Sequence, residues 1–412
     1  MRVLNDNVRK LFPLINGKDI AYLDNGATTQ KPKSVLAAVD DYYKAHNANP
    51  LRGIYELSVE ATDIYENARQ AVADFIGAQS SDEIIFTRNT SESMNLVAYS
   101  YGRSRIKAGD EIIVSVAEHH SNILPWKMIA EEKGATLKFF DCGTDGKLEP
   151  DRLREIVSEK TAIIAITQVS NVIGRINDIK EMARIAHSVG AVIVADGAQS
   201  VAHIQVDVKE LDVDFFAFSG HKMYAPMGIG VLYGKRKFLE EMPPFMYGGE
   251  MIESVTKDRT IYADIPHKFE AGTVNAGAAA GLKAAIDFIH EYGFEQIVAR
   301  ENALSAIAVE GMSEIPHVEI IGSQKACHHH GIVAFRVEGV HPHDVAQIFA
   351  DEGVCVRAGH HCAEPLHRHL AELSGIKATP STRLSIAMYN TEGEIKRFLE
   401  VLSEIRGRMG IK

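Results

Sequence analysis

The sequence predicts an α/β protein in which a large, mostly parallel sheet is covered by helices and is followed by a smaller α+β unit. Over the first two thirds of the chain, short runs that are apolar throughout alternate with stretches of helical period. Strands that are buried on both faces of a parallel sheet have this composition. Beyond about residue 285, helical patterns and isolated strands take over. With 46% hydrophobic and 24% charged residues, the composition is that of a globular protein and not of a disordered one.

Six apolar runs predict strands of the large sheet. They cover 111–116, 135–140, 162–167, 191–196, 214–219 and 229–234. Stretches with helical period, at 151–160 and 179–190, lie between them. In parallel sheets ligands bind beyond the carboxyl ends of the strands. The polar residues that directly follow each run are therefore the first candidates for a functional site.

The C-terminal part predicts a second unit. Strands are expected over 331–337 and 354–359. Thr391 and Glu394 form a capping-box pattern at the start of a final helix. The apolar face of that helix comprises Ile395, Phe398, Leu399, Leu402 and Ile405. We expect a large domain over 18–285 and a small domain over 286–412, while the segment 1–17 could pack on either of them.

Charge and composition exclude several classes of protein. The chain has 44 Lys and Arg against 55 Asp and Glu, a net charge of −11, which argues against nucleic acid as a partner. No apolar run approaches the roughly 18–20 residues that span a bilayer, and no signal peptide is visible. The four cysteines are too few for a disulfide scaffold and form no CxxC pair, which indicates a reducing compartment. We therefore expect one of them to be a reactive thiol. We expect a soluble cytoplasmic protein.

The stretch 214–230 contains the most informative lysine. A buried strand leads into Ser219, His221 and Lys222. A lysine at the end of such a strand can be partly desolvated, which lowers its pKa and suits it to covalent chemistry with carbonyl compounds. Ser219 and His221 could hold a phosphate beside it. The alternative is a surface lysine at the start of a loop.

The stretch 191–201 ends its strand on an acid. Asp196 there could keep a pyridine nitrogen protonated, as an electron-sink cofactor such as pyridoxal phosphate requires. Gln199 could reach the oxygen of the same ring. The alternative is that Asp196 caps the next helix. Asp196 alone is a weak signal. Together with Lys222, which follows the next strand, it indicates a site for a cofactor of this kind.

Two further stretches supply polar groups at strand ends. Thr90 and Ser91 lie where a loop enters a helix, and their hydroxyl and N–H groups could bind an anion. Simple capping of the helix by the same residues is the alternative. His119 follows the strand at 111–116 and could stack on a ring, although a structural role would explain it equally well.

These pieces resemble pyridoxal-phosphate enzymes of the aspartate-aminotransferase fold (fold type I), and within the class-V aminotransferase family the SufS-type (group II) cysteine desulfurases. The resemblance is sharpest at Val356–Leu366, VRAGHHCAEPL, which matches the RxGHHCA loop of that group. It covers nearly the whole chain. The matching motifs are AYLDNGATTQKP (21–32), SMNLVA, EHHSNILPW, QVSNVIG, DGAQSV, SGHKMY, FEAGTVN (269–275) and RLSIAMYN (383–390).

The resemblance implies a role for each site residue. Lys222 holds pyridoxal phosphate, Asp196 pairs with the ring nitrogen, and His119 stacks on the ring and is a candidate acid or base. Gln199 and Asn171 bond the ring-oxygen side. The phosphate ligands are Thr90, Ser91, Ser219 and His221, and Thr273 reaches the phosphate of a neighbouring subunit, which implies a homodimer. Arg383 binds the substrate carboxylate, with Arg357 as a second substrate arginine.

Cys362 is implied to be the nucleophile that takes sulfur from L-cysteine, leaving L-alanine and a persulfide for iron-sulfur cluster assembly. Arg357, His360 and His361 are candidates for lowering the pKa of this thiol. A selenocysteine lyase or a cysteine-sulfinate desulfinase, which share the fold, is the alternative. A transaminase has no use for this cysteine.

The sulfur acceptor is implied to be of the zinc-containing SufU type, of the SufE type, or the cluster scaffold itself. The segment Val340–Asp344 resembles that of enzymes that serve a SufU-type acceptor, in which a histidine takes over a zinc position. His343 is the candidate for that exchange. The alternative is a helix start with Pro342 in the first turn and a merely exposed His343.

Some residues depart from the family pattern. Ala225 and Met227 replace the usual residues beside the cofactor lysine, and Tyr55 stands where the family has a histidine. The run Cys327–His330 has no assigned counterpart. Together with other small-domain histidines it raises the alternative of a soft-metal site, although adjacent residues of a strand point to opposite faces and seldom chelate together. We expect no resident metal. The other histidines and the thiol considered for such a site are His341, His343, His360, His361 and Cys362.

Overall fold

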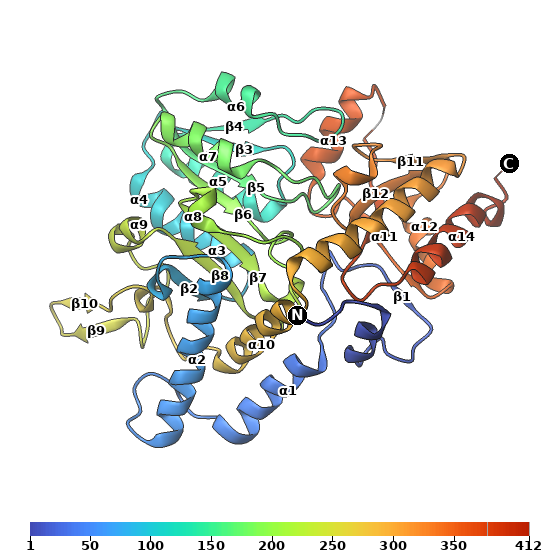
Figure 1. Ribbon diagram of the computed structural model, residues 1–412. Coiled ribbons are helices and arrows are strands. Elements are labelled where there is room, and N and C mark those ends of the chain that lie inside the picture. Colours follow the sequence, from blue (N-terminus) through green and yellow to red (C-terminus); the bar gives the residue numbers. More distant parts are fainter. Residues whose placement is uncertain (377, 412) are drawn as a thin grey trace.

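The computed structural model describes residues 1–376 and 378–411. Its largest sheet has seven strands (Figure 1). The five strands from β7 to β4 pair in parallel, and β8 is antiparallel to both of its neighbours. The mostly parallel sheet predicted from the sequence is confirmed, and β2 is an additional edge strand. In spatial order the strands are β2 (Ile84–Thr87), β8 (Gly230–Gly234), β7 (Phe215–Ser219), β6 (Val192–Asp196), β5 (Thr161–Thr167), β3 (Glu111–Ser115) and β4 (Thr136–Phe140).

Helices bury both faces of the central strands of this sheet, which is why those strands are almost entirely apolar, whereas the edge strand β4 is largely exposed. In β3, Ile113 belongs to one hydrophobic core, whereas Ile112 and Val114 belong to another on the opposite face. The first core includes α2 (Glu56–Phe75), α7 (Ile179–Ser188) and α10 (Ala276–Tyr292). The second includes α3 (Thr90–Val97), α5 (Leu124–Lys133) and α9 (Arg236–Glu241). The remaining helices of the large part are α1 (Lys33–Asp41), α4 (Arg103–Arg105), α6 (Pro150–Ile156) and α8 (Val208–Leu211).

Short helical turns complete the connections. They are η1 (Asp6–Leu11), η2 (Tyr42–His46), η3 (Ser81–Glu83), η4 (Ala98–Gly102), η5 (His120–Asn122), η6 (Gly220–Lys222), η7 (His267–Phe269) and η8 (Ala326–His328). Two of them lie beside the candidate site: η6 follows β7 directly and ends at Lys222, and η5 follows β3 after a four-residue loop that ends at His119.

The C-terminal part contains a four-stranded antiparallel sheet in the order β11-β12-β15-β14. Residues of α11, α12 and α14 form the core on one face of it, where the rings of Phe349 and Phe398 stack. The capping box of Thr391 and Glu394 at the start of α14 is present as predicted. The elements are α11 (Phe294–Glu314), β11 (Val318–Ile320), β12 (Ile332–Val337), α12 (Pro342–Asp351), α13 (Glu364–Leu373), β15 (Ser381–Ser385) and α14 (Glu392–Arg408).

The single strand expected over 354–359 is wrong in detail. It is divided into β13 (Val354–Cys355) and β14 (Arg357–Gly359). β13 pairs in parallel with β1 (Ala21–Tyr22), whereas β14 pairs with β15. The chain therefore changes its pairing partner at Val356, which no local pattern indicates. A predicted domain boundary at 285/286 falls within α10, and the division into domains stays a prediction.

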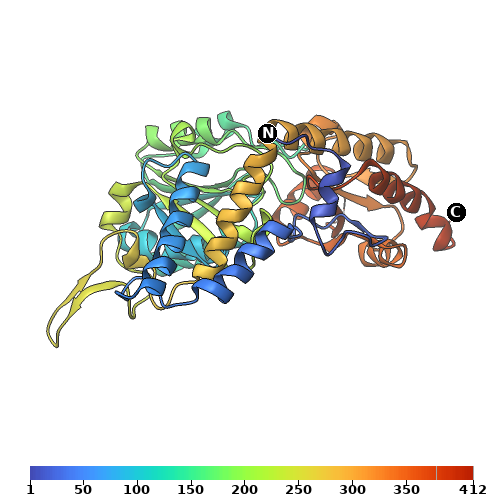
Figure 2. The same ribbon diagram turned by 60° about the horizontal axis from the view of Figure 1, so that its bottom comes forward.

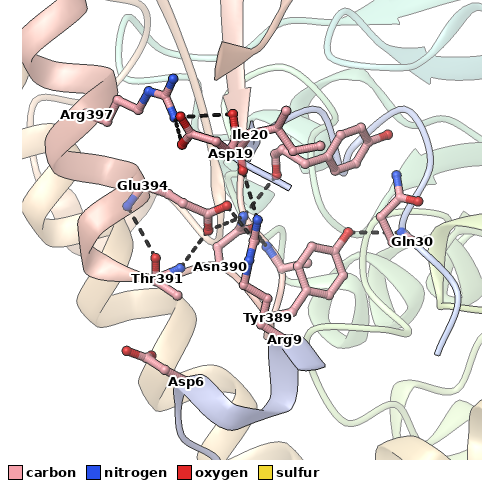
Figure 3. A network of polar contacts seen from close by, with 12 residues as sticks. Asp6, Arg9, Asp19, Ile20, Gln30, Tyr389, Asn390, Thr391, Glu394 and Arg397 are labelled. Atoms are coloured by element: carbon pink, nitrogen blue, oxygen red, sulfur yellow. Dashed lines mark hydrogen bonds and ion pairs between the residues drawn. The ribbon is translucent and has the colours of Figure 1, made fainter. Parts of the chain in front are cut away.

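The N-terminal segment contacts both parts of the molecule. Arg9 donates to Glu394 of α14 at 2.6 Å and to the carbonyl oxygen of Ile20 at 2.8 Å (Figure 3). The ring of Phe12 contacts Tyr224, which follows η6, and Tyr389, which precedes α14. Residues 1–17 thus lie against both units, a packing that the sequence left open.

One hairpin projects from the body of the large part. It is formed by β9 (Ile252–Val255) and β10 (Thr260–Tyr262) and extends away from the sheet (Figure 2). Within the part of the chain that the structure describes, no helix is both long enough and apolar enough to cross a bilayer.

Candidate active site

A cavity of ≈ 500 Å³ lies where the carboxyl ends of β5, β6 and β7 meet β14 and β15 of the small sheet. The sequence placed its candidates after these strands, and the structure brings nearly all of them together. The predicted residues that line the cavity are Thr90, Ser91, His119, Asn171, Asp196, Gln199, Ser219, His221, Lys222, Arg357, Cys362 and Arg383. Thr273 does not line it and is exposed.

Lys222 ends the turn η6 directly after β7, and its amine is the principal titrating group of the cavity. Burial disfavours the ammonium form and lowers the pKa of Lys222 to about 8, although the charge of Asp196 opposes this shift. The positive charge of Arg383 adds to the lowering. An amine with such a pKa has a far larger deprotonated fraction near neutral pH than an ordinary lysine, about one tenth at pH 7, and it is the deprotonated form that acts as a nucleophile or a base.

Asp196 is the last residue of β6 and is buried. One carboxylate oxygen accepts the backbone N–H of Ala198 at 2.9 Å. Burial raises the pKa of Asp196, while this hydrogen bond and the charge of Lys222 oppose the rise. Gln199 donates its amide to the carbonyl oxygen of Gly26 at 2.8 Å. Among the described residues no arginine or lysine forms a salt bridge with this buried carboxylate, which is therefore suited to pair with a cationic ring nitrogen.

Hydroxyl groups gather at the N-terminus of α3. The Thr90 backbone N–H donates to the Ser219 hydroxyl at 2.8 Å, and the two hydroxyls are 2.7 Å apart. Ser91 and Ser121 are likewise joined through their hydroxyls, at 2.6 Å. The buried Nδ1 atom of His221 has no hydrogen-bond partner within residues 1–376 and 378–411. The helix N-terminus, the hydroxyls and this free ring nitrogen make a site for an anion with several oxygen atoms.

His119 is fixed in its neutral form. Its Nδ1 atom accepts the backbone N–H of Ser121 at 3.1 Å. Burial and the positive charge of Lys222 lower the pKa of His119 to about 3. The preceding residue, Glu118, is buried and accepts hydrogen bonds from Ser115, Asn122 and the backbone N–H of Thr167. Glu118 thereby ties the ends of β3 and β5 to the turn that carries His119.

Cys362 lies in a constrained loop between β14 and α13. His361 and Cys362 both have a left-handed backbone, with φ of 53° and 56°. The backbone N–H of His120 donates to the Cys362 carbonyl oxygen at 2.7 Å, and the Asn171 amide donates to the His361 carbonyl oxygen at 2.7 Å. The thiol side of Cys362 is exposed to the cavity. The loop is held by its backbone, so the side chain remains accessible.

His361 is not placed to assist the thiol by charge. Its Nε2 atom bonds to the hydroxyl of Ser381 at 3.0 Å, and its pKa falls to about 2 because of burial and the positive charge of Arg383. Asn171, expected on the ring-oxygen side of a cofactor, uses its amide N–H on the Cys362 loop in this structure. Its backbone carbonyl oxygen accepts from Arg383.

Two arginines close the cavity from the small sheet. Arg383 is buried, donates to the Asn171 carbonyl oxygen at 2.9 Å and lies 3.3 Å from Asp24. Arg357 donates hydrogen bonds to both carboxylate oxygens of Asp24, the shortest from Nη2 to Oδ2 at 2.8 Å. Sequence reasoning missed Asp24 as a site residue, and it also missed Glu118. Their only sequence signal is an acid at the end of a short apolar run, which is common at helix and turn starts.

The residues that depart from the family pattern differ in burial. Ala225 is buried, whereas Met227 and Tyr55 are exposed. His343 is exposed on the first turn of α12, where Pro342 is the first helical residue and the His343 N–H donates to the Nδ1 atom of His341 at 3.2 Å.

The run Cys327–His330 is used within the fold. The ring of His329 bonds to the carbonyl oxygens of Ser323 and Ile332, and His328 bonds to the Ser323 hydroxyl at 2.7 Å. Across residues 1–376 and 378–411, no group of three or more His, Cys, Asp or Glu side chains is arranged to hold a metal ion.

Comparisons with known proteins agree with this geometry. The family model for aminotransferase class V matches residues 21–398. A protein of Halalkalibacterium halodurans described as a probable cysteine desulfurase is 46% identical over 407 residues, 98% of each chain. A crystal structure of a cysteine desulfurase from Escherichia coli is similar at 36% identity and a TM-score of 0.90, covering 99% of this chain and 100% of that one. The apo structure of a cysteine desulfurase from Thermococcus onnurineus is similar at 42% identity and a TM-score of 0.93, with 99% of each chain covered.

Proposed function

We propose that this chain, which belongs to the aminotransferase class-V family and is a pyridoxal-phosphate-dependent cysteine desulfurase, uses Cys362 as its sulfur acceptor. In the proposed reaction L-cysteine is converted to L-alanine. One observation carries the proposal. Lys222, which suits proton transfer at carbon, and Cys362, which suits attack at sulfur, line the same cavity. A transaminase would need the lysine but not the thiol.

The residues present fit pyridoxal phosphate. The anion site at the N-terminus of α3, with the unpartnered Nδ1 atom of His221, suits the phosphate. Asp196 suits a protonated ring nitrogen, and Lys222 suits the covalent attachment of an aldehyde. When bound, pyridoxal phosphate supplies an electron sink for negative charge at the substrate Cα atom.

The proposed steps follow from the side chains. Arg383 binds the substrate carboxylate and thereby orients the Cα–H bond. Lys222, once free, removes the Cα proton, because its pKa of about 8 lets it act as a base near neutral pH. The neutral His119, with Nδ1 already occupied, is suited to pack against a ring and to donate from Nε2.

The sulfur step needs the thiolate of Cys362. The thiolate attacks the substrate sulfur, an S–S bond forms and the Cβ–S bond breaks. The electron pair of that bond stays with Cβ, which takes up a proton and becomes the methyl group of alanine. Sulfur remains as a persulfide on Cys362, and we propose that it is passed on for iron-sulfur cluster assembly in the cytoplasm. All four cysteines are free, which agrees with a reducing compartment.

A homodimer is the proposed assembly. Thr273 is exposed on a loop held by Glu270, whose buried carboxylate pairs with Arg69 at 2.7 Å. The segments around this loop adjoin one another, since Gly272 donates to the Gly249 carbonyl oxygen and Arg52 pairs with Glu250. They expose a set of large apolar side chains, which a second copy would cover. The set is Ile54, Tyr55, Met227, Met246 and Tyr247.

A SufU-type acceptor that engages His343 is one proposed partner, with a SufE-type protein or the scaffold as alternatives. His341 and His343 are exposed side by side, with ring centroids 5.1 Å apart. α12 packs beside β14, the strand that leads into the Cys362 loop. A neutral imidazole at this place is a ligand that zinc accepts in exchange for a thiolate.

Alanine formation tests the proposed reaction against its alternatives. Purified protein with bound cofactor is incubated with L-cysteine, L-selenocysteine or L-cysteine sulfinate, with and without a reducing thiol. A desulfurase forms alanine from cysteine at a rate that the thiol increases, because the thiol clears the persulfide. Turnover of selenocysteine or sulfinate without turnover of cysteine would instead support a lyase or a desulfinase.

A further inference from the structure

The loop that carries Cys362 has an unfavourable backbone that its surroundings must hold. His361 and Cys362 are consecutive residues with left-handed backbones, at φ of 53° and 56°. Residues with a side chain keep this conformation only where neighbouring groups fix it. The loop joins β14 to α13, and Cys362 is exposed and lines the cavity. The contacts that fix this backbone therefore decide where the thiol stands.

His120 of η5 contacts this loop through two separate groups. Its backbone N–H donates to the Cys362 carbonyl oxygen at 2.7 Å. Its ring Nε2 atom accepts the backbone N–H of Glu364 at 3.2 Å. The two contacts lie on either side of Ala363. One residue of the large part thus holds both ends of the short turn that follows the thiol.

The ring contact also satisfies the start of a helix. Glu364 is the first residue of α13, and the N–H groups of a first helical turn have no partner within the helix. The residue at the N-cap position is Ala363, whose methyl group cannot accept a hydrogen bond. The ring of His120 performs this capping from a distant segment of the chain. Loss of the ring would free the Glu364 N–H and weaken the hold on the loop.

The capping contact requires a neutral imidazole, because both nitrogen atoms of an imidazolium are donors. Burial lowers the pKa of His120, the charge of Glu364 opposes this shift, and His360 adds to it. Arg368 pairs with Glu364 at 2.6 Å and balances its charge. The preceding residue, His119, is neutral as well, with a pKa of about 3. His120 is therefore able to accept the helix N–H at pH 7.

We propose that His120 is a positioning residue that holds the Cys362 loop where the thiol reaches the substrate sulfur, and that it takes no part in proton transfer at Cα. The proposal rests on the proposed function and adds a residue to its sulfur step. In that step the thiolate forms an S–S bond, the Cβ–S bond breaks, and its electron pair stays with Cβ. A displacement of about 1 Å lowers the rate of such a step steeply. Substrate binding and removal of the Cα proton depend instead on Arg383 and Lys222, which belong to β15 and η6.

The first test separates the sulfur step from the proton step in protein with bound cofactor. His120→Ala should lower kcat for alanine formation from L-cysteine about tenfold or more, with KM within about threefold of wild type. Incorporation of deuterium at the Cα atom of L-alanine, followed by NMR, needs no thiol and should stay within about threefold. His120→Gln keeps an acceptor at the position of Nε2 and should restore at least about half of kcat.

Each contrary result of this test overturns the proposal. An unchanged kcat in His120→Ala shows that the sulfur step does not need the ring. A fall in deuterium incorporation as large as the fall in kcat shows that His120 acts on the proton step, through His119 or Lys222. His187→Ala is the matched control, because its ring bonds to Asp214 at 2.9 Å and does not line the cavity. Both rates should be unchanged in this control.

Amide hydrogen exchange gives a second readout that does not depend on turnover. In the peptide that contains residues 360–366, His120→Ala should exchange about fivefold faster than wild type at pH 7, because one hydrogen bond of the loop is lost. His120→Gln should exchange at the wild-type rate. An opened loop frees His120 to bind a proton with an ordinary pKa, so opening becomes more favourable below about pH 6.5. Wild type should therefore exchange faster than His120→Gln at about pH 5.5.

The two readouts also keep the proposal separate from the proposed function. If wild-type protein forms no alanine from cysteine, the proposed function fails, while amide exchange still decides whether His120 holds the loop. Equal amide exchange of the 360–366 peptide in wild type and His120→Ala refutes the role of His120 alone.

Discussion

Lys222 and Asp196 stand at the ends of neighbouring parallel strands and shift each other's pKa in opposite directions. Burial lowers the pKa of Lys222 to about 8, and the charge of Asp196 limits the fall. Burial raises the pKa of Asp196, and the charge of Lys222 limits the rise. β6 and β7 pair so that Asp196 lies beside Ala217, two residues before the end of β7. The parallel register therefore creates an amine and a carboxylate that act together in one cavity.

The lowered pKa of Lys222 predicts a pH-dependent cost to stability. Between about pH 8 and 10.5 the unfolded chain binds the proton more readily than the folded one, so stability rises with pH in this window. In the cofactor-free protein, Lys222→Met removes the cost and should increase the free energy of unfolding by about 3 kcal/mol at pH 7. Near pH 10 the gain should fall to about 1 kcal/mol. Chemical denaturation of both proteins at the two pH values measures it, and a gain that is equal at both contradicts the shifted pKa.

Lys222→Ala should abolish turnover of L-cysteine and the visible absorbance of covalently bound cofactor. No other lysine lines the cavity among the described residues. Lys31→Ala is the matched control, because Lys31 is also largely buried and bonds to the His221 carbonyl oxygen at 3.0 Å but does not line the cavity. We expect the control to keep its absorbance. Covalent cofactor on another lysine in Lys222→Ala would refute the assignment.

The dimer proposal predicts that assembly and cofactor retention are linked. Tyr247→Asp places a charge in the exposed apolar set and should give monomers that lose the cofactor. Thr273→Ala should weaken cofactor retention about tenfold or more while the dimer persists, because only a hydrogen bond is removed. Sedimentation and cofactor titration measure both. Met409→Asp, which alters an exposed apolar residue at the other end of the molecule, is the control. A monomer that retains cofactor and full activity would rule the dimer requirement out.

The acceptor proposal separates basal activity from stimulated activity. His343→Ala should form alanine from L-cysteine at the wild-type rate when a small thiol clears the persulfide. With a zinc-containing SufU-type acceptor, stimulation should be lost in His343→Ala and retained in His341→Ala, the neighbouring control. If both variants are stimulated equally, the exchange at His343 is wrong. Stimulation by a SufE-type protein instead would favour the alternative partner.

Much of the fold follows from sequence because burial on both faces leaves a clear pattern. The six apolar runs became β3 to β8 with bounds that differ by about one residue. The antiparallel direction of β8 has no such signature, since an apolar strand reads the same in either direction. Strand β2 was missed because its four residues are too short to stand out beside the loop that follows.

The sequence predicts those site residues that lie at or just after the end of an apolar run, because the strand itself can be recognised. Asp196 ends an apolar run, Lys222 and His119 follow one within a few residues, and all three line the cavity. Asp24 and Arg357 were not predicted to pair, because their contact joins segments from opposite ends of the chain. The expected role of Thr273 involves the phosphate site of a second subunit, so it stays a prediction. The assignments of the individual site residues also stay predictions.

The most direct test of the account is the fate of sulfur on Cys362. Protein with bound cofactor is treated with L-cysteine in the absence of reductant, and the peptide that contains Cys362 is weighed by mass spectrometry beside the alanine formed. The account predicts that this peptide gains the mass of one sulfur atom in wild type, in proportion to alanine in the first turnover. Cys362→Ser should keep bound cofactor and form neither product, whereas alanine from cysteine at the wild-type rate in Cys362→Ser would contradict the central claim.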